Sequence, residues 1–248
     1  MTVRLRLMTY NVHGGVGVDR KLDLDRIAAV IRREQPDVVA LQELDVGRLR
    51  SGGVDQARHI AERLGMASHF HAAFRVQEEE YGDALLSPLP MRLVRAGSLP
   101  RPAGSPRVIE HRGAQWVAIL LPDGRELQVI NTHLGLVPLE QRGQVDALLG
   151  PEWTGDPDFA RGPSVLLGDF NATSRYAAYR RLAARMTDVQ RAFAAEPVRT
   201  FPARLPMLRI DHVFTAGAVT ALDAWAPNAA LARIASDHLP LCVDVELA

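Results

Sequence analysis

The segment Val165–Leu166–Leu167–Gly168–Asp169–Phe170–Asn171–Ala172 places an acid and an amide directly after a short apolar run. The run has the length of a buried strand, and Gly168 marks its end. Open sheets usually bind their ligands just beyond the ends of strands. Asp169 and Asn171 are therefore candidates for holding a water molecule or a phosphate oxygen. Asp and Asn are also ordinary turn residues, so this segment alone does not decide the function.

The same arrangement recurs along the chain, because polar groups follow or open several other apolar strands. The side chains concerned are Asn11, Glu43, Asn131 with His133, and Asp237 with His238. Each has a structural interpretation of its own: a turn for Asn11, a solvated strand end for Glu43, a hydrogen-bonded core histidine for His133. If the strands lie side by side, however, all of these groups converge on one edge of a sheet.

One further acid stands inside an apolar segment, at Asp211 in Arg209–Ile210–Asp211–His212–Val213–Phe214. An inward-facing carboxylate in a strand is costly unless it is paired, so we expect Asp211 to have a partner.

Hydrophobic periodicity and turn residues predict the remaining elements. Helices are expected from the N-cap Asp23 to a stop at Pro36, from about Asp55 to Gly65, and from about Pro138 to Leu149. Strands are expected at 3–11, 37–43, 84–86, 113–121, 126–131, 165–167, 209–214 and 239–247. The acidic run Glu78–Glu79–Glu80 is expected in a solvated loop. Arginines dominate 175–209, which is either a cationic rim near a phosphate or a solvated helix face.

Composition indicates a globular chain with a large core, since 47% of its 248 residues are hydrophobic and 23% are charged. No segment reads as a linker, so one domain over 1–248 is expected. The single Cys242 excludes an intramolecular disulfide and a cysteine metal cluster. No transmembrane segment or signal-peptide core is visible, which favours a cytoplasmic location, and no protein partner is predicted.

Six motifs, TYNVHGG, LQE, INTHLG, GDFNA, RIDHVF and SDHLP, stand in this order over almost the whole chain. Together they resemble the endonuclease/exonuclease/phosphatase family, which has the deoxyribonuclease-I-like fold. The resemblance implies an α+β fold: a four-layer α/β/β/α sandwich of two packed mixed sheets flanked by helices. It also implies metal-dependent hydrolysis of a phosphodiester or phosphomonoester.

The resemblance assigns a role to each matching position. It implies Glu43 as the main metal carboxylate, with Asn11 and Asp237 beside it. It implies Asp169 as the residue that orients and deprotonates the attacking water. The other implied roles are Asn171 and His133 as phosphate or water contacts, His238 on the scissile phosphate, and Asp211 fixing the tautomer of His238. His13, Asn131 and Arg112 are further candidates for contacts with a substrate phosphate.

The available donors are carboxylate, amide and imidazole groups, with no thiolate, which suits Mg²⁺ and also Mn²⁺. A nuclease acting on DNA or RNA is the preferred interpretation. The alternatives are a lipid or small-molecule phosphoesterase, similar to sphingomyelinases or inositol phosphatases, and a non-catalytic binding protein. Calcineurin-like metallophosphatases also carry Gly-Asp, but their Asp-x-His and Gly-Asn-His motifs do not occur here.

Overall fold

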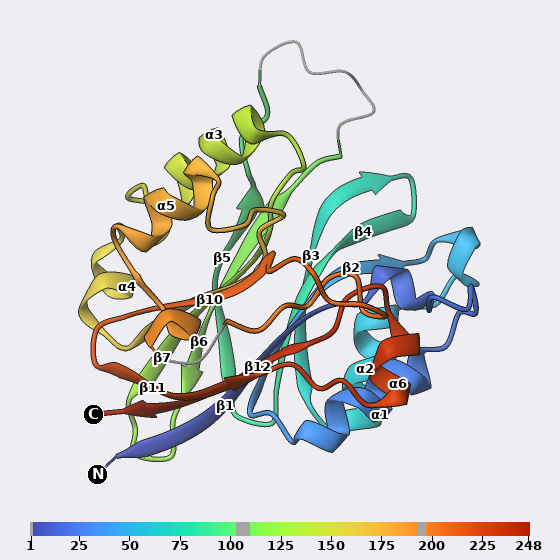
Figure 1. The fold of residues 1–248 in the computed structure, drawn as a ribbon, viewed down its shortest axis with the longest axis horizontal. Helices are drawn as coiled ribbons and strands as arrows, with labels where there is room; N and C mark the ends of the chain where they lie inside the picture. Colours follow the sequence, from blue (N-terminus) through green and yellow to red (C-terminus); the bar gives the residue numbers. More distant parts are fainter. Residues whose placement is uncertain (1, 103–109, 193–196) are drawn as a thin grey trace.

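The computed structural model describes residues 2–102, 110–192 and 197–248. Two six-stranded sheets pack face to face, and helices cover the outer face of each (Figure 1). The helices α1, α2 and α6 lie on one side of the molecule, and α3, α4 and α5 lie on the other (Figure 1). This is the predicted four-layer sandwich, which is thereby confirmed.

The first sheet has the order β11-β12-β1-β2-β4-β3, in which only β1 and β2 are parallel neighbours. Its strands are β1 (Val3–Asn11), β2 (Val38–Val46), β3 (Ala67–Val76), β4 (Glu79–Ser87), β11 (Val219–Trp225) and β12 (Leu241–Leu247). The expected loop at Glu78–Glu80 is wrong in part, because Glu79 and Glu80 open β4 and pair with β3.

The second sheet has the order β5-β6-β7-β8-β10-β9, in which β7 and β8 are parallel. Its strands are β5 (Met91–Ser98), β6 (Gly113–Leu120), β7 (Glu126–His133), β8 (Ser164–Asp169), β9 (Thr187–Asp188) and β10 (Asp211–Ala216). Each sheet thus contains one parallel pair. Strands of both pairs end in residues singled out from the sequence: β1 ends at Asn11, β7 at His133 and β8 at Asp169.

The three predicted helices form where their end signals stand. The helices are α1 (Leu24–Glu34), α2 (Gln56–Leu64), α3 (Pro138–Leu148), α4 (Pro157–Arg161), α5 (Ala177–Ala183) and α6 (Ala230–Ala235), with short 3-10 turns at His13–Gly15, Leu49–Ser51 and Val189–Ala192. The Asp23 and Asp55 carboxylates accept the backbone N–H groups of Arg26 and Arg58, which caps α1 and α2. Among the described residues, no helix is long and apolar enough to cross a membrane.

The core between the sheets is apolar along most of the strands and becomes polar toward one end. Side chains such as Leu7, Val129 and Val165 meet there with no exposure to solvent. Nearer the strand ends, Asn131 is fully buried between the two sheets. Its amide nitrogen donates to the backbone oxygens of Leu41 and Ala84 at 3.0 Å each, and its amide oxygen accepts from Gln42 at 2.8 Å. The Asn131 amide therefore joins the sheets and is not available for the predicted contact with a substrate phosphate.

Replacing Asn131 by alanine is expected to lower the free energy of unfolding by about 2–5 kcal/mol, because two buried carbonyl groups lose their donors. Denaturant unfolding of the variant, beside Asn228→Ala at an exposed position, measures this loss. If Asn131→Ala kept wild-type stability and lost only activity, the result would support the predicted contact between Asn131 and a substrate phosphate.

Candidate active site

A cleft of about 470 Å³ opens at the polar end of the two sheets. Side chains from both sheets, from α3 and from five loops line it. They include Glu43, Tyr81, Arg112, His133, Asp169, Asn171, Phe201, Asp237 and His238. The expected convergence of separate chain segments on one edge is therefore present in the structure.

Glu43 owes its position to an irregularity in β2. The pairing of β2 with β4 shifts register between Leu41 and Leu44, and Glu43 has a φ of +63°. A positive φ is unfavourable for a residue with a side chain and is found mainly where function requires it. A bulge of this kind redirects one side chain. The Glu43 carboxylate is 24% exposed and lines the cleft.

Asn11 connects the carboxylates of the two sheets. Its amide nitrogen donates to Glu43 Oε1 at 2.8 Å and to Asp169 Oδ2 at 3.0 Å. Asn11 is buried at the end of β1, so these two acids are held at a fixed separation by a side chain that cannot move freely. The other oxygen of Asp169 accepts the backbone N–H of Asn171 at 2.9 Å.

Asp169, His133 and Asp211 are direct neighbours in the second sheet. Asp169 on β8 pairs with His133 on β7 and with Asp211 on β10. Gly168 has a φ of +148°, and a Cβ at this position would lie 1.8 Å from the Thr132 carbonyl oxygen. The glycine of the GDFNA motif is therefore required for β8 to approach β7 this closely.

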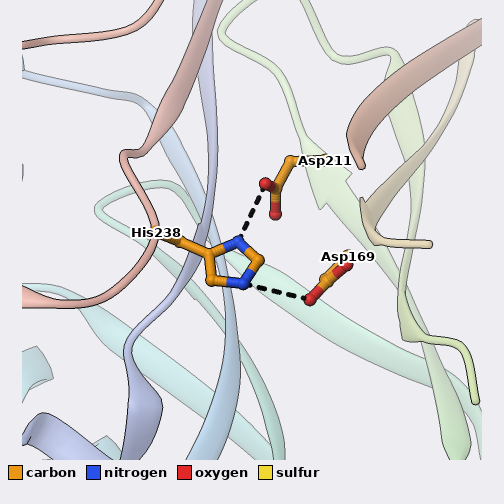
Figure 2. A group of neighbouring side chains, drawn as sticks. All are labelled: Asp169, Asp211 and His238. Atoms are coloured by element: carbon orange, nitrogen blue, oxygen red, sulfur yellow. Dashed lines mark hydrogen bonds and ion pairs between the residues drawn. The ribbon is translucent and has the colours of Figure 1, made fainter. Parts of the chain in front are cut away.

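His238 lies between two carboxylates, as Figure 2 shows. Its Nδ1 is 3.0 Å from Asp211 Oδ2, and its Nε2 is 3.7 Å from Asp169 Oδ2. Burial lowers the pKa of His238, but the negative charges of Asp211 and Asp169 outweigh burial and raise it to about 10. The ring is therefore an imidazolium at neutral pH. The buried strand acid Asp211, expected to need a partner, has His238 and also the Thr200 hydroxyl.

Asp169 is almost fully buried, and this burial raises its pKa to about 7. The nearby His238 cation opposes the rise, whereas the charge of Asp211 adds to it. A carboxyl group with a pKa near neutrality accepts a proton more readily than an ordinary aspartate does.

His133, the last residue of β7, is a neutral ring in the cleft. Its Nδ1 is 2.9 Å from the Arg112 guanidinium, and its Nε2 is 3.5 Å from Asp169 Oδ2 and 3.0 Å from the Asn171 amide nitrogen. Burial, with the cations Arg112 and His238 nearby, holds the pKa of His133 well below its usual value. Because Arg112 can only donate, Nδ1 accepts and the proton of the neutral ring lies on Nε2, facing Asp169 Oδ2. The Asn171 amide nitrogen donates instead to the Leu134 carbonyl oxygen at 3.0 Å.

The donor set in the cleft fits a hard divalent cation at Glu43. Glu43 Oε2 has no hydrogen-bond partner among the described residues, and the carboxylates of Asp169 and Asp237 line the same cleft, whereas Asn11 turns its amide nitrogen toward Glu43. The group Asp169, Asp211 and His238 also has ligand atoms within 4.8 Å of one another. In that group both ring nitrogens face carboxylates, so the imidazolium already balances their charge.

Asp83 is a member of the site that the sequence interpretation missed. It lies on β4, is fully buried, and accepts the backbone N–H of Glu43. Burial raises its pKa to about 7, although the Arg112 cation opposes this. Asp83 therefore supports the bulge that presents Glu43. Its signal was a lone acid next to an apolar strand segment, the same signal that singled out Asp211.

Two predicted residues lie outside the cleft. The amide of Asn131 makes its hydrogen bonds between the sheets, as described above. His13 is 49% exposed at the outer edge, with its Nδ1 3.8 Å from Asp237 Oδ1. Phe201, which was not predicted, packs its ring against the ring of His238 at 4.8 Å. The structure brings the other predicted residues together: Asn11, Glu43, Arg112, His133, Asp169, Asn171, Asp211, Asp237 and His238.

Comparison with known proteins finds relatives of nearly the whole chain. The uncharacterized protein YbhP of Escherichia coli K12 is 27% identical over 98% of this chain and 96% of its own length. The crystal structure of an endonuclease/exonuclease/phosphatase protein from Beutenbergia cavernae is similar with a TM-score of 0.74 and 25% identity, over 99% of this chain and 72% of that one.

The human Nocturnin catalytic domain, solved with a bound sulfate anion, has the same fold with a TM-score of 0.74 and 21% identity, over 100% of this chain and 97% of that one. The profile of the endonuclease/exonuclease/phosphatase family matches residues 8–238, which span every residue of the cleft. This chain belongs to the endonuclease/exonuclease/phosphatase family.

Proposed function

We propose that this protein is a divalent-cation-dependent phosphodiesterase that works by in-line attack of water, with 1–248 as one catalytic domain. The observation that carries the proposal is the pair formed by Asp169 and the His238 imidazolium in the cleft that Glu43 also lines. Hydrolysis of a phosphoester needs a group that accepts a proton from water and positive charge on the phosphate oxygens. This cleft contains both.

The roles follow from position and charge. Asp169 orients the attacking water and takes its proton, and Asn171 holds that water or a phosphate oxygen. His238 and Arg112 place positive charge on the phosphate, while His133 offers a neutral N–H donor. Asp211 keeps the His238 ring oriented and charged.

Glu43 and Asp237 would hold Mg²⁺ or Mn²⁺, and Asn11 beside them would keep the Glu43 carboxylate in place. When bound, such a cation supplies further charge neutralisation at the phosphate oxygens.

Nucleic acid is the substrate class we favour for this centre. A panel of DNA, RNA, sphingomyelin, an inositol phosphate and bis-para-nitrophenyl phosphate, assayed with Mg²⁺ and with Mn²⁺, tests both the activity and the class. Absence of turnover on every substrate, together with measurable metal binding, would support the non-catalytic alternative instead.

Removal of divalent cations is expected to abolish turnover of bis-para-nitrophenyl phosphate, and added Mg²⁺ or Mn²⁺ is expected to restore it. Because a ligand that binds only the folded state stabilises it, Mg²⁺ is also expected to raise the Tm of the wild type. Glu43→Gln should lose this rise in Tm, whereas Glu62→Gln on the exposed face of α2 should keep it. Full turnover in excess EDTA would rule out the metal-dependent proposal.

A lipid phosphoester is the second candidate, because apolar side chains stand at the edge of the cleft. Leu136 and Leu139 are 71% and 67% exposed, and Leu136 lines the cleft. An apolar edge of this kind suits a substrate with an acyl or other apolar group. Preference for sphingomyelin over DNA and RNA in the same panel would favour this candidate.

A further inference from the structure

A second cleft, of about 860 Å³, lies beside the catalytic one. Four arginines, Arg175, Arg191, Arg199 and Arg209, help to line it, together with the hydroxyl residues Thr173 and Ser174. No acidic residue is among the described residues of its lining. It lies within the arginine-rich region 175–209 that the sequence identified.

The two clefts share a wall. Thr173 in the second cleft is two residues beyond Asn171 in the first, and Arg199 is two residues before Phe201. Leu208 in the second cleft pairs with Phe201 through backbone hydrogen bonds of 2.8 and 3.2 Å. Two residues of extended chain span about 7 Å. A ligand group in the second cleft is therefore the immediate neighbour of a phosphate at His238.

Three of the four arginines of this cleft carry a charge that no carboxylate of a described residue neutralises. Arg175, Arg191 and Arg199 are exposed and form no ion pair with a described residue, whereas arginines such as Arg6 and Arg50 have carboxylate partners. Their positive charge is thus available to an anion. A solvated face would explain their exposure, but it would not explain why they line one cleft together.

Arg209 adds a buried donor to the lining. Its side chain is nine-tenths buried, and its Nη2 contacts Asp188 and the Tyr179 hydroxyl. Its Nη1 is buried and has no hydrogen-bond acceptor among the described residues. A buried donor without an acceptor is unfavourable in a folded protein, and a bound anion would satisfy it.

We propose that this cleft, the distal arginine cleft, binds a second phosphate of the substrate, which is a nucleic acid strand. The inference rests on the proposed phosphodiesterase function and names its substrate class. A strand repeats its phosphates along one backbone, so a strand with one phosphate at His238 presents the next ones to Arg175, Arg191 and Arg199. Guanidinium groups suit this task because they bind phosphate oxygens with two parallel N–H groups.

The test variant replaces Arg175, Arg191 and Arg199 by glutamine together. A matched control replaces Arg33, Arg58 and Arg161, three exposed arginines that line neither cleft, and so changes the net charge equally. Binding of a fluorescent single-stranded oligonucleotide is measured by anisotropy in EDTA over a series of salt concentrations. Turnover is measured on the oligonucleotide and on bis-para-nitrophenyl phosphate, which carries a single phosphate.

The test variant is expected to bind the oligonucleotide about 10- to 100-fold more weakly, with the slope of log affinity against log salt reduced by about 2. Its KM for the oligonucleotide should rise, while its kinetics on bis-para-nitrophenyl phosphate stay at the wild-type level. The control variant should behave as the wild type in all of these measurements.

Equal oligonucleotide binding by the test and control variants would overturn the inference. So would an equal loss on bis-para-nitrophenyl phosphate, which would show that the arginines support the fold. Selective loss of binding to vesicles containing anionic phospholipid, with oligonucleotide binding unchanged, would assign the cleft to a lipid surface. Because anisotropy in EDTA needs no turnover, failure of the phosphodiesterase proposal is seen separately, as a wild type that binds the strand without cleaving any phosphodiester.

Discussion

Asp169→Asn is expected to lower kcat on a phosphodiester by about 10²–10⁴-fold, the usual loss when a catalytic base is removed. Asparagine has nearly the same shape and can keep one of the two hydrogen bonds that Asp169 accepts from Asn11 and from the Asn171 backbone. It cannot take a proton from water. The fold should therefore survive, and the loss should appear in kcat more than in KM.

The pH profile gives a second measurement of the same role. Burial raises the pKa of Asp169 to about 7, so the catalytic carboxylate is present above that pH and is lost as the pH falls through it. The wild-type rate should rise with pH through this region, and the residual rate of Asp169→Asn should not. Asp244→Asn, on β12 and ion-paired to Arg6, is the control. Wild-type turnover by Asp169→Asn would remove Asp169 from the mechanism.

His238→Ala is expected to cost a similar factor, about 10²–10⁴-fold, because the phosphate loses a fixed positive charge. The lost contribution is stabilisation of negative charge on the phosphate oxygens, so the loss should appear in kcat. Circular dichroism and Tm confirm that the variant folds. Turnover within tenfold of the wild type would contradict the role given to His238.

Asp211→Asn tests whether Asp211 only positions the His238 ring or also keeps that ring charged. The Asp211 carboxylate, 3.0 Å from His238 Nδ1, is the largest influence that raises the pKa of this ring. A raised histidine pKa means that the charged ring is present below about 10 and is lost as the pH rises through that value. In Asp211→Asn, the fall in activity on the alkaline side should move to lower pH. If kcat fell but the alkaline side of the pH profile did not move, Asp211 would have a structural role only.

The sequence predicts which residues face the space between the sheets, but not how close each of them lies to the cleft. Asn131 and His133 are two residues apart on β7 and share a face. Asn131 lies where the sheets are in contact and bonds across the interface, whereas His133 reaches the point where the cleft opens. Periodicity is the same for both, so only the packing of the first sheet against the second distinguishes a structural amide from a site residue.

Edge strands were the main elements that the pattern did not reveal. The strands β3, β5 and β11 stand at the edges of their sheets and were not predicted. Their side chains are mostly exposed or half-buried, and β5 contains no fully buried residue. Edge strands carry polar residues on both faces, which removes the alternation on which strand prediction depends.

Backbone conformation at the site was equally hidden in the sequence. The bulge at Glu43 and its positive φ depend on the pairing of β2 with β4 and on the buried Asp83 beneath it. The ordered motifs placed Glu43 in the site by resemblance, but no residue pattern near LQE indicates a register shift. Its origin lies in a strand some forty positions further along the chain.

The hydrogen bonds of Asn11 tie a carboxylate of one sheet to a carboxylate of the other. Turnover therefore requires that the two sheets are packed against each other. A denaturation intermediate that retained both sheets, yet let them slide apart, would keep its circular dichroism spectrum and be catalytically silent. Enzymatic assay during unfolding would then detect the separation before any spectroscopic probe of strand content.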